Sequence, residues 1–203
     1  MRRGAISLSG FEAKFEADAD PWDTWQSRYE AVKRDALAKA MGSGTYGRGL
    51  ELAAGNGSNT PVIAQKVRRL LITDGTRAGA ELMRERFAGQ SRLTIVQHDA
   101  GTRLPGHRFD LIVISELLYY LEDRAFGVLA GEVARTLTPG GRLVMVHHEQ
   151  NFADRARQAA SVHRDFLSLL TGPMRPVRQI KARLWRAEAW ERPLENWQET
   201  ASD

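Results

Sequence analysis

Three carboxylates stand where short apolar runs of the sequence end, and together they could bind a polar ligand. Glu51 lies within "LELAAGNG", Asp74 closes "LITD" and Asp99 follows "LTIVQH". In nucleotide-binding folds, a carboxylate about 20 residues beyond the glycine-rich turn accepts hydrogen bonds from the ribose, and Asp74 stands at roughly that distance from Glu51. A carboxylate at Asp99 could accept a hydrogen bond from the amino group of an adenine. The three positions therefore predict a nucleoside site.

A corner of small residues follows the first of these carboxylates. Small residues let the backbone turn sharply and approach a ligand closely. Neither the dinucleotide pattern G-x-G-x-x-G nor the phosphate loop G-x-x-x-x-G-K-[ST] is present. The corner would also suit an ordinary strand-to-helix turn, Asp74 could cap a helix, and Asp99 could close an Asx turn. The other candidate binding residues at these strand ends are Ala53, Gly55, Asn56, Gly57, Gly75, Ala100 and Ser115.

Strands that alternate with helices must position these side chains. Apolar periodicity predicts helices at 21–41, with Asp20 as its cap, and at 59–67, 78–88, 124–137 and 155–170. It predicts strands at 50–54, 68–74, 93–99, 109–115 and 142–149, and a strand pair within 176–193. This alternation predicts a parallel sheet, in which ligands bind beyond the carboxyl ends of the strands.

Composition limits the chemistry and the class of protein. The 203 residues predict one domain, and the absence of cysteine excludes disulfides, cysteine–zinc sites and thiol nucleophiles. The formal charge of +4 leaves a nucleic-acid partner open, although 29 basic residues are dispersed among 25 acidic ones. No apolar stretch approaches the roughly 20 residues of a membrane span, so we expect a cytoplasmic protein.

The order of these motifs resembles that of class I S-adenosylmethionine-dependent methyltransferases. "ELAAGNG", "LITD", "QHDA", "FDLIVISELLYYL" and "LTPGGRLVMV" match successive motifs of that family over roughly residues 48–150, except that Ala53 replaces a glycine. The resemblance implies S-adenosylmethionine as the cofactor. It also implies a single domain, 1–203, with a doubly wound, mostly parallel seven-stranded Rossmann-like sheet.

The flanking segments resemble a narrower group, the nodulation-protein-S-like methyltransferases. "DPWDTWQSRYEAVKRD", "SELLYYL" and "ARLWRAEAWERP" carry this likeness. It implies that Trp22, Tyr29 and Lys33 belong to an N-terminal helical lid (1–45) that touches the cofactor, before a cofactor-binding core (46–150) and a C-terminal helix and strand pair (151–203). The aromatic rings could contact a sulfonium and Lys33 a carboxylate. Alternatively, the rings belong to the core and Lys33 to the solvated surface.

That group methylates the free amine of a deacetylated chitooligosaccharide, so the resemblance implies an amine acceptor. An amine must present a lone pair, which a nearby base promotes. The candidate catalytic residues are Glu116, His147 and His148, although either histidine could be structural and Glu116 could contact the cofactor or cap a helix. Metal binding is not expected, because H-E-x-x-H is absent. The candidate substrate residues are Tyr119, Tyr120, His163 and Asp165.

Two other functions remain compatible with the sequence. The basic charge would suit an RNA or DNA methyltransferase, although "SELLYY" replaces the Asn/Asp-Pro-Pro-aromatic motif of amino-methylating enzymes. The alanine in the corner leaves open a protein that binds the cofactor without catalysis. The leading prediction is an N-methyltransferase of a small-molecule or oligosaccharide amine, with no membrane partner and an oligomeric state that the sequence does not predict.

Overall fold

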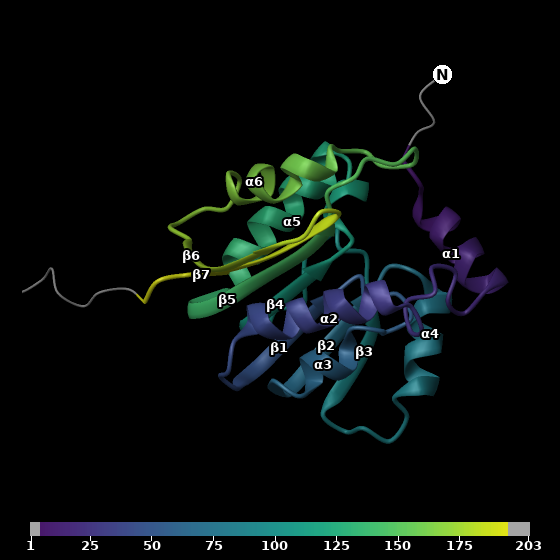
Figure 1. Cartoon of the computed structure of the whole chain (residues 1–203). Helices are drawn as coiled ribbons and strands as arrows, with labels where there is room; N and C mark the ends of the chain where they lie inside the picture. The colour runs from purple at the N-terminus through teal and green to yellow at the C-terminus, as the bar shows by residue number, and fades with distance from the viewer. Residues whose placement is uncertain (1–4, 195–203) are drawn as a thin grey trace, which may run out of the picture.

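The computed structural model describes residues 5–194, which build one seven-stranded sheet between two layers of helices (Figure 1). The strand order is β3-β2-β1-β4-β5-β7-β6; only β7 runs antiparallel to its neighbours β5 and β6. This confirms the predicted doubly wound, mostly parallel sheet. The strands are β1 Tyr46–Leu52, β2 Val67–Asp74, β3 Leu93–Gln97, β4 Phe109–Ser115, β5 Leu137–His148, β6 Arg175–Lys181 and β7 Trp185–Glu191.

The helices divide between the two faces of the sheet because successive strand side chains point to opposite sides. In β4, Leu111 and Val113 pack in the cluster formed with α2, α3 and α4, whereas Ile112 and Ile114 pack in the cluster formed with α5 and α6. Both clusters are fully buried, which fits a parallel sheet covered on both faces. The helices are α1 Leu8–Ala17, α2 Arg28–Met41, α3 Thr60–Ala64, α4 Arg77–Arg86, α5 Asp123–Thr136 and α6 Val162–Leu167, with short 3₁₀ turns at Leu118–Tyr120 and Ala159–Ser161.

The N-terminal region differs from the prediction in two ways. The predicted helix 21–41 begins only at Arg28, because the Asp20 carboxylate accepts hydrogen bonds from the backbone of Thr24 and Trp25 at 2.8 and 3.0 Å and folds this stretch into turns. The sequence prediction also missed α1, which Ser7 caps by accepting a hydrogen bond from the Gly10 backbone at 3.2 Å. This helix lies at the edge of the molecule, away from the sheet layers (Figure 1).

The C-terminal region confirms the strand pair and corrects the helix before it. The predicted helix 155–170 shortens to a 3₁₀ turn and α6, and the stretch before them is joined to Tyr119, whose carbonyl accepts from the Ala156 and Arg157 amides at 2.8 and 3.0 Å. Residues 138–141, between the predicted helix 124–137 and the predicted strand 142–149, lie inside β5, where Gly140 adopts a φ of 74°.

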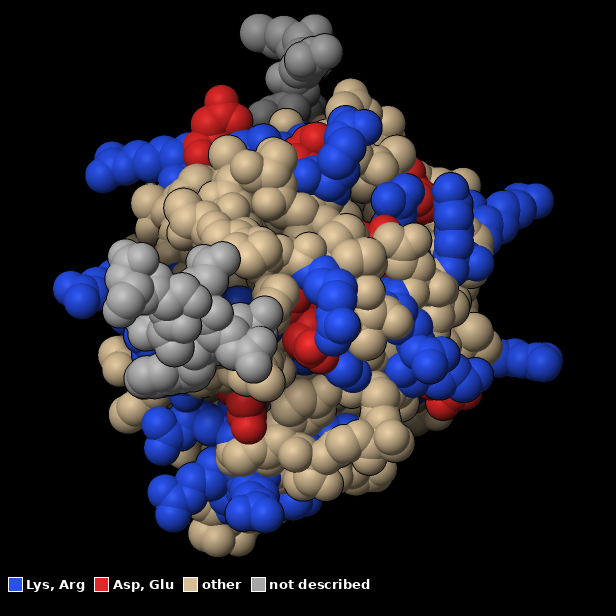
Figure 2. Space-filling view, turned by 90° about the vertical axis from the view of Figure 1, so that its left-hand side faces the viewer, with Lys and Arg blue, Asp and Glu red and all other residues tan. Residues whose placement is uncertain are grey.

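The regions predicted as 1–45 and 151–203 include residues 1–4 and 195–203, which lie outside the described part of the chain. Within residues 5–194, no helix combines the length and apolar character needed to cross a bilayer. Figure 2 shows the side of the molecule opposite α1, where Lys and Arg side chains are spread over the surface with Asp and Glu among them.

Candidate active site

A cavity of about 460 Å³ lies over the carboxyl ends of β1, β2 and β4, where the strand order reverses, and α1 forms one of its walls. Pockets for small ligands typically measure roughly 300–1,000 Å³. This cavity thus lies where an open α/β sheet is expected to bind ligands. Twelve predicted site residues line it: Trp22, Lys33, Ala53, Gly55, Asn56, Asp74, Gly75, Ser115, Glu116, Tyr119, Tyr120 and His148.

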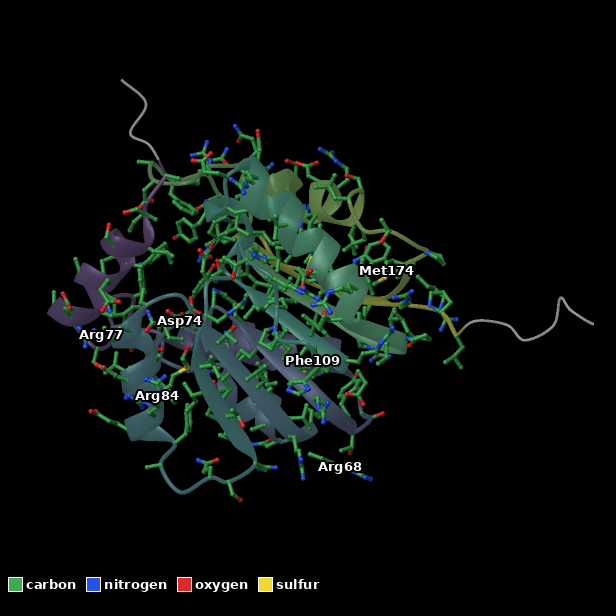
Figure 3. The ribbon with its side chains drawn as sticks, turned by 180° about the vertical axis from the view of Figure 1, so that it is seen from behind. Arg68, Asp74, Arg77, Arg84, Phe109 and Met174 are labelled. Carbon is green, nitrogen blue, oxygen red and sulfur yellow. The ribbon has the colours of Figure 1, made fainter. Side chains whose placement is uncertain are left out.

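Asp74 connects the small-residue corner to the end of β2. Its Oδ2 accepts a hydrogen bond from the Gly55 amide at 2.7 Å, and its Oδ1 accepts one from the Thr76 amide at 2.8 Å and one from the Thr76 hydroxyl at 2.5 Å. A carboxylate offers about four lone-pair positions, so acceptor capacity remains for a ligand. Burial raises the pKa of Asp74, and the hydrogen bonds from Thr76 and Gly55 oppose that effect only in part. Figure 3 shows Asp74 near α1 at the ends of the strands, with Arg77 close by.

The absence of side chains in the corner allows α1 to approach. A Cβ atom at Gly75 would lie 2.6 Å from Leu8, and one at Gly55 would lie 3.1 Å from Phe15. Gly55 also has a φ of 60°, a conformation that favours glycine. Glu12 of α1 then accepts a hydrogen bond from the Arg77 amide at 2.8 Å, which attaches α1 to the start of α4.

Glu51 is buried and does not line the cavity. Its Oε2 accepts a hydrogen bond from the Thr60 hydroxyl at 2.7 Å. Burial raises the pKa of Glu51 to about 8, because desolvation disfavours the charged carboxylate more than the Thr60 hydrogen bond favours it. Glu51 is therefore mostly protonated at neutral pH, and its role is to join β1 to α3.

We expect Glu51→Gln to flatten the pH dependence of stability. Between the unfolded pKa of about 4.3 and the folded pKa of about 8, the folded protein binds the Glu51 proton more tightly than the unfolded chain. The free energy of unfolding therefore falls as pH rises through this window, by at most about 1.4 kcal/mol per pH unit. Glutamine does not titrate and its carbonyl can still accept from Thr60. Urea titrations at pH 5 and pH 8 should show a smaller loss of stability in the variant; equal losses would contradict the buried, protonated Glu51.

Glu116 follows β4 and presents its carboxylate to the cavity. Its backbone has a φ of 53°, which is unusual for a residue other than glycine. Its Oε1 lies 2.6 Å from the Lys33 ammonium, and its Oε2 accepts hydrogen bonds from the Tyr119 hydroxyl and, at 3.3 Å, from the His148 amide. Burial alone would raise its pKa, but Lys33 and then His148 outweigh that effect and lower the pKa. Glu116 is therefore an ionised carboxylate at the centre of the site.

His148 lies between Glu116 and Tyr29. Its Nε2 is 4.0 Å from the Glu116 Oε1, and its Nδ1 is 2.9 Å from the Tyr29 hydroxyl, whose ring stacks on the imidazole. Burial, and then the charges of Glu116 and Glu30, raise the pKa of the Tyr29 hydroxyl, so that this group stays protonated. The imidazole is one-third exposed, with a side-chain exposure of 33%, and connects the Glu116 carboxylate to solvent.

His147 points to the opposite side of β5, as expected for adjacent residues of a strand. It is fully buried, and its Nε2 accepts hydrogen bonds from the Leu117 and Leu118 amides, each at 3.1 Å. Burial lowers the pKa of His147 well below its usual value. A neutral imidazole with an occupied Nε2 has no lone pair directed at the cavity, so the geometry leaves Glu116 and His148 as the candidate bases.

Other predicted site residues lie away from the cavity wall. Asp99 follows β3 and closes an Asx turn by accepting a hydrogen bond from the Gly101 amide at 2.8 Å. His163 faces His147 in the interior, and Asp165 accepts a hydrogen bond from the Ser161 hydroxyl at 2.7 Å. The predicted residues outside the cavity lining are Tyr29, Glu51, Gly57, Asp99, Ala100, His147, His163 and Asp165.

Several cavity residues were not predicted from the sequence. Phe11 of α1 packs edge-on against Tyr120 with ring centroids 4.9 Å apart, and Phe152 packs against Tyr119 at the same distance. The helical spacing of Leu8, Phe11 and Phe15 after a capping serine was the available signal for α1. Across residues 5–194, His, Asp and Glu side chains nowhere gather in a group of three or more that could hold a metal ion.

The sequence matches a known family over part of the chain. Residues 50–141 match the family described as Methyltransferase domain. The seven-stranded sheet and the cavity at its switch point agree with this match and with the resemblance to class I S-adenosylmethionine-dependent methyltransferases.

The chain is also similar to curated methyltransferases and to nodulation protein S. It is 32% identical to nodulation protein S of Rhizobium tropici over 128 residues, which are 62% of this chain and 53% of that protein. It is 33% identical to demethylmenaquinone methyltransferase of Clavibacter sepedonicus over 114 residues, which are 55% of this chain and 45% of that protein. The chain thus spans about half the length of these curated relatives.

A solved structure extends the likeness over nearly the whole fold. The N-methyltransferase NodS of Bradyrhizobium japonicum WM9, in complex with S-adenosyl-L-homocysteine, superposes with a TM-score of 0.76 and 23% sequence identity. The similarity covers 92% of this chain and 98% of that chain. At this identity the likeness establishes the fold.

The cavity residues fit S-adenosylmethionine, the cofactor of the class that the sequence resembles. Asp74 retains acceptor capacity for ribose hydroxyls, and the apolar side chains of Leu8 and Phe15 pack over Gly75 and Gly55 beside it. The ammonium of Lys33 is buried at the cavity wall, where a carboxylate would find a cation. The ring of Trp22, which is 43% exposed, adds an aromatic face to the cavity lining.

Proposed function

We propose that this protein transfers a methyl group from S-adenosylmethionine to an amine of a small molecule, with an amino sugar or amino-sugar oligosaccharide as the acceptor class. The observation that carries the proposal is the ionised Glu116 carboxylate in the cavity, 4.0 Å from the imidazole of His148. The cofactor supplies a methyl group carried on a positively charged sulfur. The chain itself must hold the acceptor nitrogen, exclude water and remove a proton.

Glu116 and His148 would have different roles at the acceptor nitrogen. The carboxylate accepts a hydrogen bond from the amine and balances the positive charge that develops on nitrogen as it is methylated. His148 carries the released proton towards solvent, because its imidazole lies beside the Glu116 carboxylate and is one-third exposed. Tyr29 fixes the orientation of that imidazole through the 2.9 Å contact with Nδ1.

Carboxylates and aromatic rings in the outer part of the cavity support a cationic or sugar-like acceptor. Asp154 and Glu30 line the cavity with Glu116, and the rings of Tyr120 and Phe152 form an apolar wall. Aromatic faces attract cationic groups, and carboxylates bind ammonium groups. Similarity to nodulation protein S further supports an amino-sugar acceptor.

The test is transfer of labelled methyl groups to a panel of acceptors. We expect label to appear on glucosamine or on chitosan oligomers, and not on their N-acetylated counterparts, because in an amide the nitrogen lone pair is delocalised into the carbonyl and is no longer nucleophilic. Transfer RNA in the same panel examines a nucleic-acid acceptor. Tight binding of S-adenosylhomocysteine without transfer to any amine would contradict the proposal. Label on RNA alone would show that the acceptor is a nucleic acid and not a small-molecule amine.

A further inference from the structure

We propose that His147, His163 and Glu188 form a buried hydrogen-bond relay that positions the segment 116–118 and thereby holds the Glu116 carboxylate in place for the acceptor. His147 and His163 are positioning residues in this proposal, and neither lines the cavity. The inference rests on the proposed function only for its catalytic consequence. The relay itself is a property of the fold.

The inner end of the relay holds the backbone beside Glu116. Leu117 and Leu118 begin the 3₁₀ turn after β4, and both amides donate to a single atom, the Nε2 of His147, at 3.1 Å each. An amide buried without an acceptor costs about 1–3 kcal/mol. One imidazole nitrogen of β5 therefore satisfies both donors of this turn.

These contacts fix the protonation of both histidines. Because Nε2 of His147 accepts, the proton of this neutral imidazole must be on Nδ1, which lies 2.9 Å from Nε2 of His163. His163 must then accept on Nε2 and carry its own proton on Nδ1, which lies 3.2 Å from the Glu188 carboxylate. The hydrogen bonds run in one direction, from Leu117 and Leu118 through His147 to His163, whose Nδ1 lies beside the Glu188 carboxylate.

The outer end of the relay is an ionised carboxylate. Burial alone would raise the pKa of Glu188, but its contact with the His163 imidazole, followed by those with Trp190 and Arg186, outweighs that effect and lowers the pKa. The Trp190 indole also donates to Glu188 at 3.3 Å, and Arg186 lies 3.6 Å from its second oxygen. Strand β7 carries Glu188 and therefore provides the end of the relay that follows His163 of α6.

Glu116 is the residue that needs such support. Its left-handed φ of 53° costs about 1 kcal/mol or more for a residue with a side chain, so the surrounding contacts must impose it. The Glu116 amide donates to the Val146 carbonyl at 2.9 Å, and the next two amides are those bound by His147. Strand β5 thus determines the backbone conformation that directs the carboxylate into the cavity.

Two substitutions at His147 separate positioning from simple packing. Glutamine keeps an acceptor oxygen at the end of its side chain, whereas leucine fills the space and has no acceptor. We expect His147→Leu to lower kcat for amine methylation about 30-fold, with the Kd of S-adenosylhomocysteine within about threefold of the unchanged protein, and His147→Gln to recover at least about a third of the kcat. Equal kcat for the leucine and glutamine variants would overturn the proposal.

Nitrogen-15 NMR of the unchanged protein tests the relay without any assay of activity and without any variant. We expect both buried histidines to show a protonated Nδ1 and an unprotonated Nε2, and the Leu117 and Leu118 amides to exchange slowly with solvent. A protonated Nε2 on either ring would overturn the relay. If both signatures are found but no amine is methylated, the relay stands and the proposed function fails.

Discussion

Replacement of Asp74 by asparagine is expected to weaken binding of S-adenosylhomocysteine by about 100-fold. Both Asp74 oxygens accept backbone hydrogen bonds, one from Gly55 and one from Thr76. Asparagine offers one oxygen and turns an amino group towards the other donor, so the small-residue corner must shift and a ribose acceptor is lost. Hydrogen bonds to charged groups contribute about 1.5–3 kcal/mol, and about 1.4 kcal/mol corresponds to a tenfold change in Kd. Isothermal calorimetry measures this loss directly.

Asp110→Asn is the matched control for this substitution. Asp110 also accepts from two backbone amides, those of Gly47 and Arg48, at 2.6 and 2.8 Å. It lies at the other end of the sheet and does not line the cavity of the site. We expect similar losses of thermal stability in the two variants but an unchanged Kd in Asp110→Asn. Asp74→Asn that binds as tightly as the unchanged protein would remove Asp74 from the cofactor site.

Glu116→Gln is expected to lower kcat for amine methylation by 100-fold or more. The carboxylate is the ionised group that faces the cavity beside Lys33 and His148. Glutamine is nearly isosteric but neutral, so it cannot balance positive charge on the acceptor nitrogen or receive its proton. General acid–base groups contribute about 10²–10⁴ in rate. Lys33 keeps Glu30 as a partner at 3.0 Å, so the cavity wall retains one of its two ion pairs.

The control for Glu116 is Glu149→Gln. Glu149 follows His148 directly, pairs with Arg186 and does not line the cavity. Single-turnover rates with saturating acceptor should fall in Glu116→Gln and stay within about twofold in Glu149→Gln. Equal effects of the two substitutions would show that loss of charge at this strand end, and not the position of Glu116, determines the rate.

The sheet could be predicted because its signals are local. Continuous apolar strands, small residues at the corner and the spacing of Glu51 and Asp74 each follow from the requirements of a buried parallel sheet. Helix α1 escaped prediction because its apolar face is short and packs on the cavity rather than on a large core. Its attachment depends on the hydrogen bond between Glu12 and the Arg77 amide at the start of α4. These two residues are separated by 65 positions in the sequence.

The roles within the candidate site could be predicted only in part. His147 and His148 are adjacent on β5, so one must face the interior and the other the cavity, but the sequence does not say which. The structure directs His147 towards His163 and His148 towards Tyr29. The position of Asp99 after a strand also did not predict its surroundings. Its carboxylate accepts a hydrogen bond from an amide two residues away and does not line the cavity.

A crystal structure of this protein with S-adenosylhomocysteine is the most direct test of the cofactor site. We expect the adenosine to lie beside Asp74 and Gly75, inside the cavity that α1 borders. The amino-acid end of the ligand should lie towards Lys33 and Ser115. A nucleoside bound elsewhere on the protein, or an empty cavity at saturating ligand, would contradict this expectation.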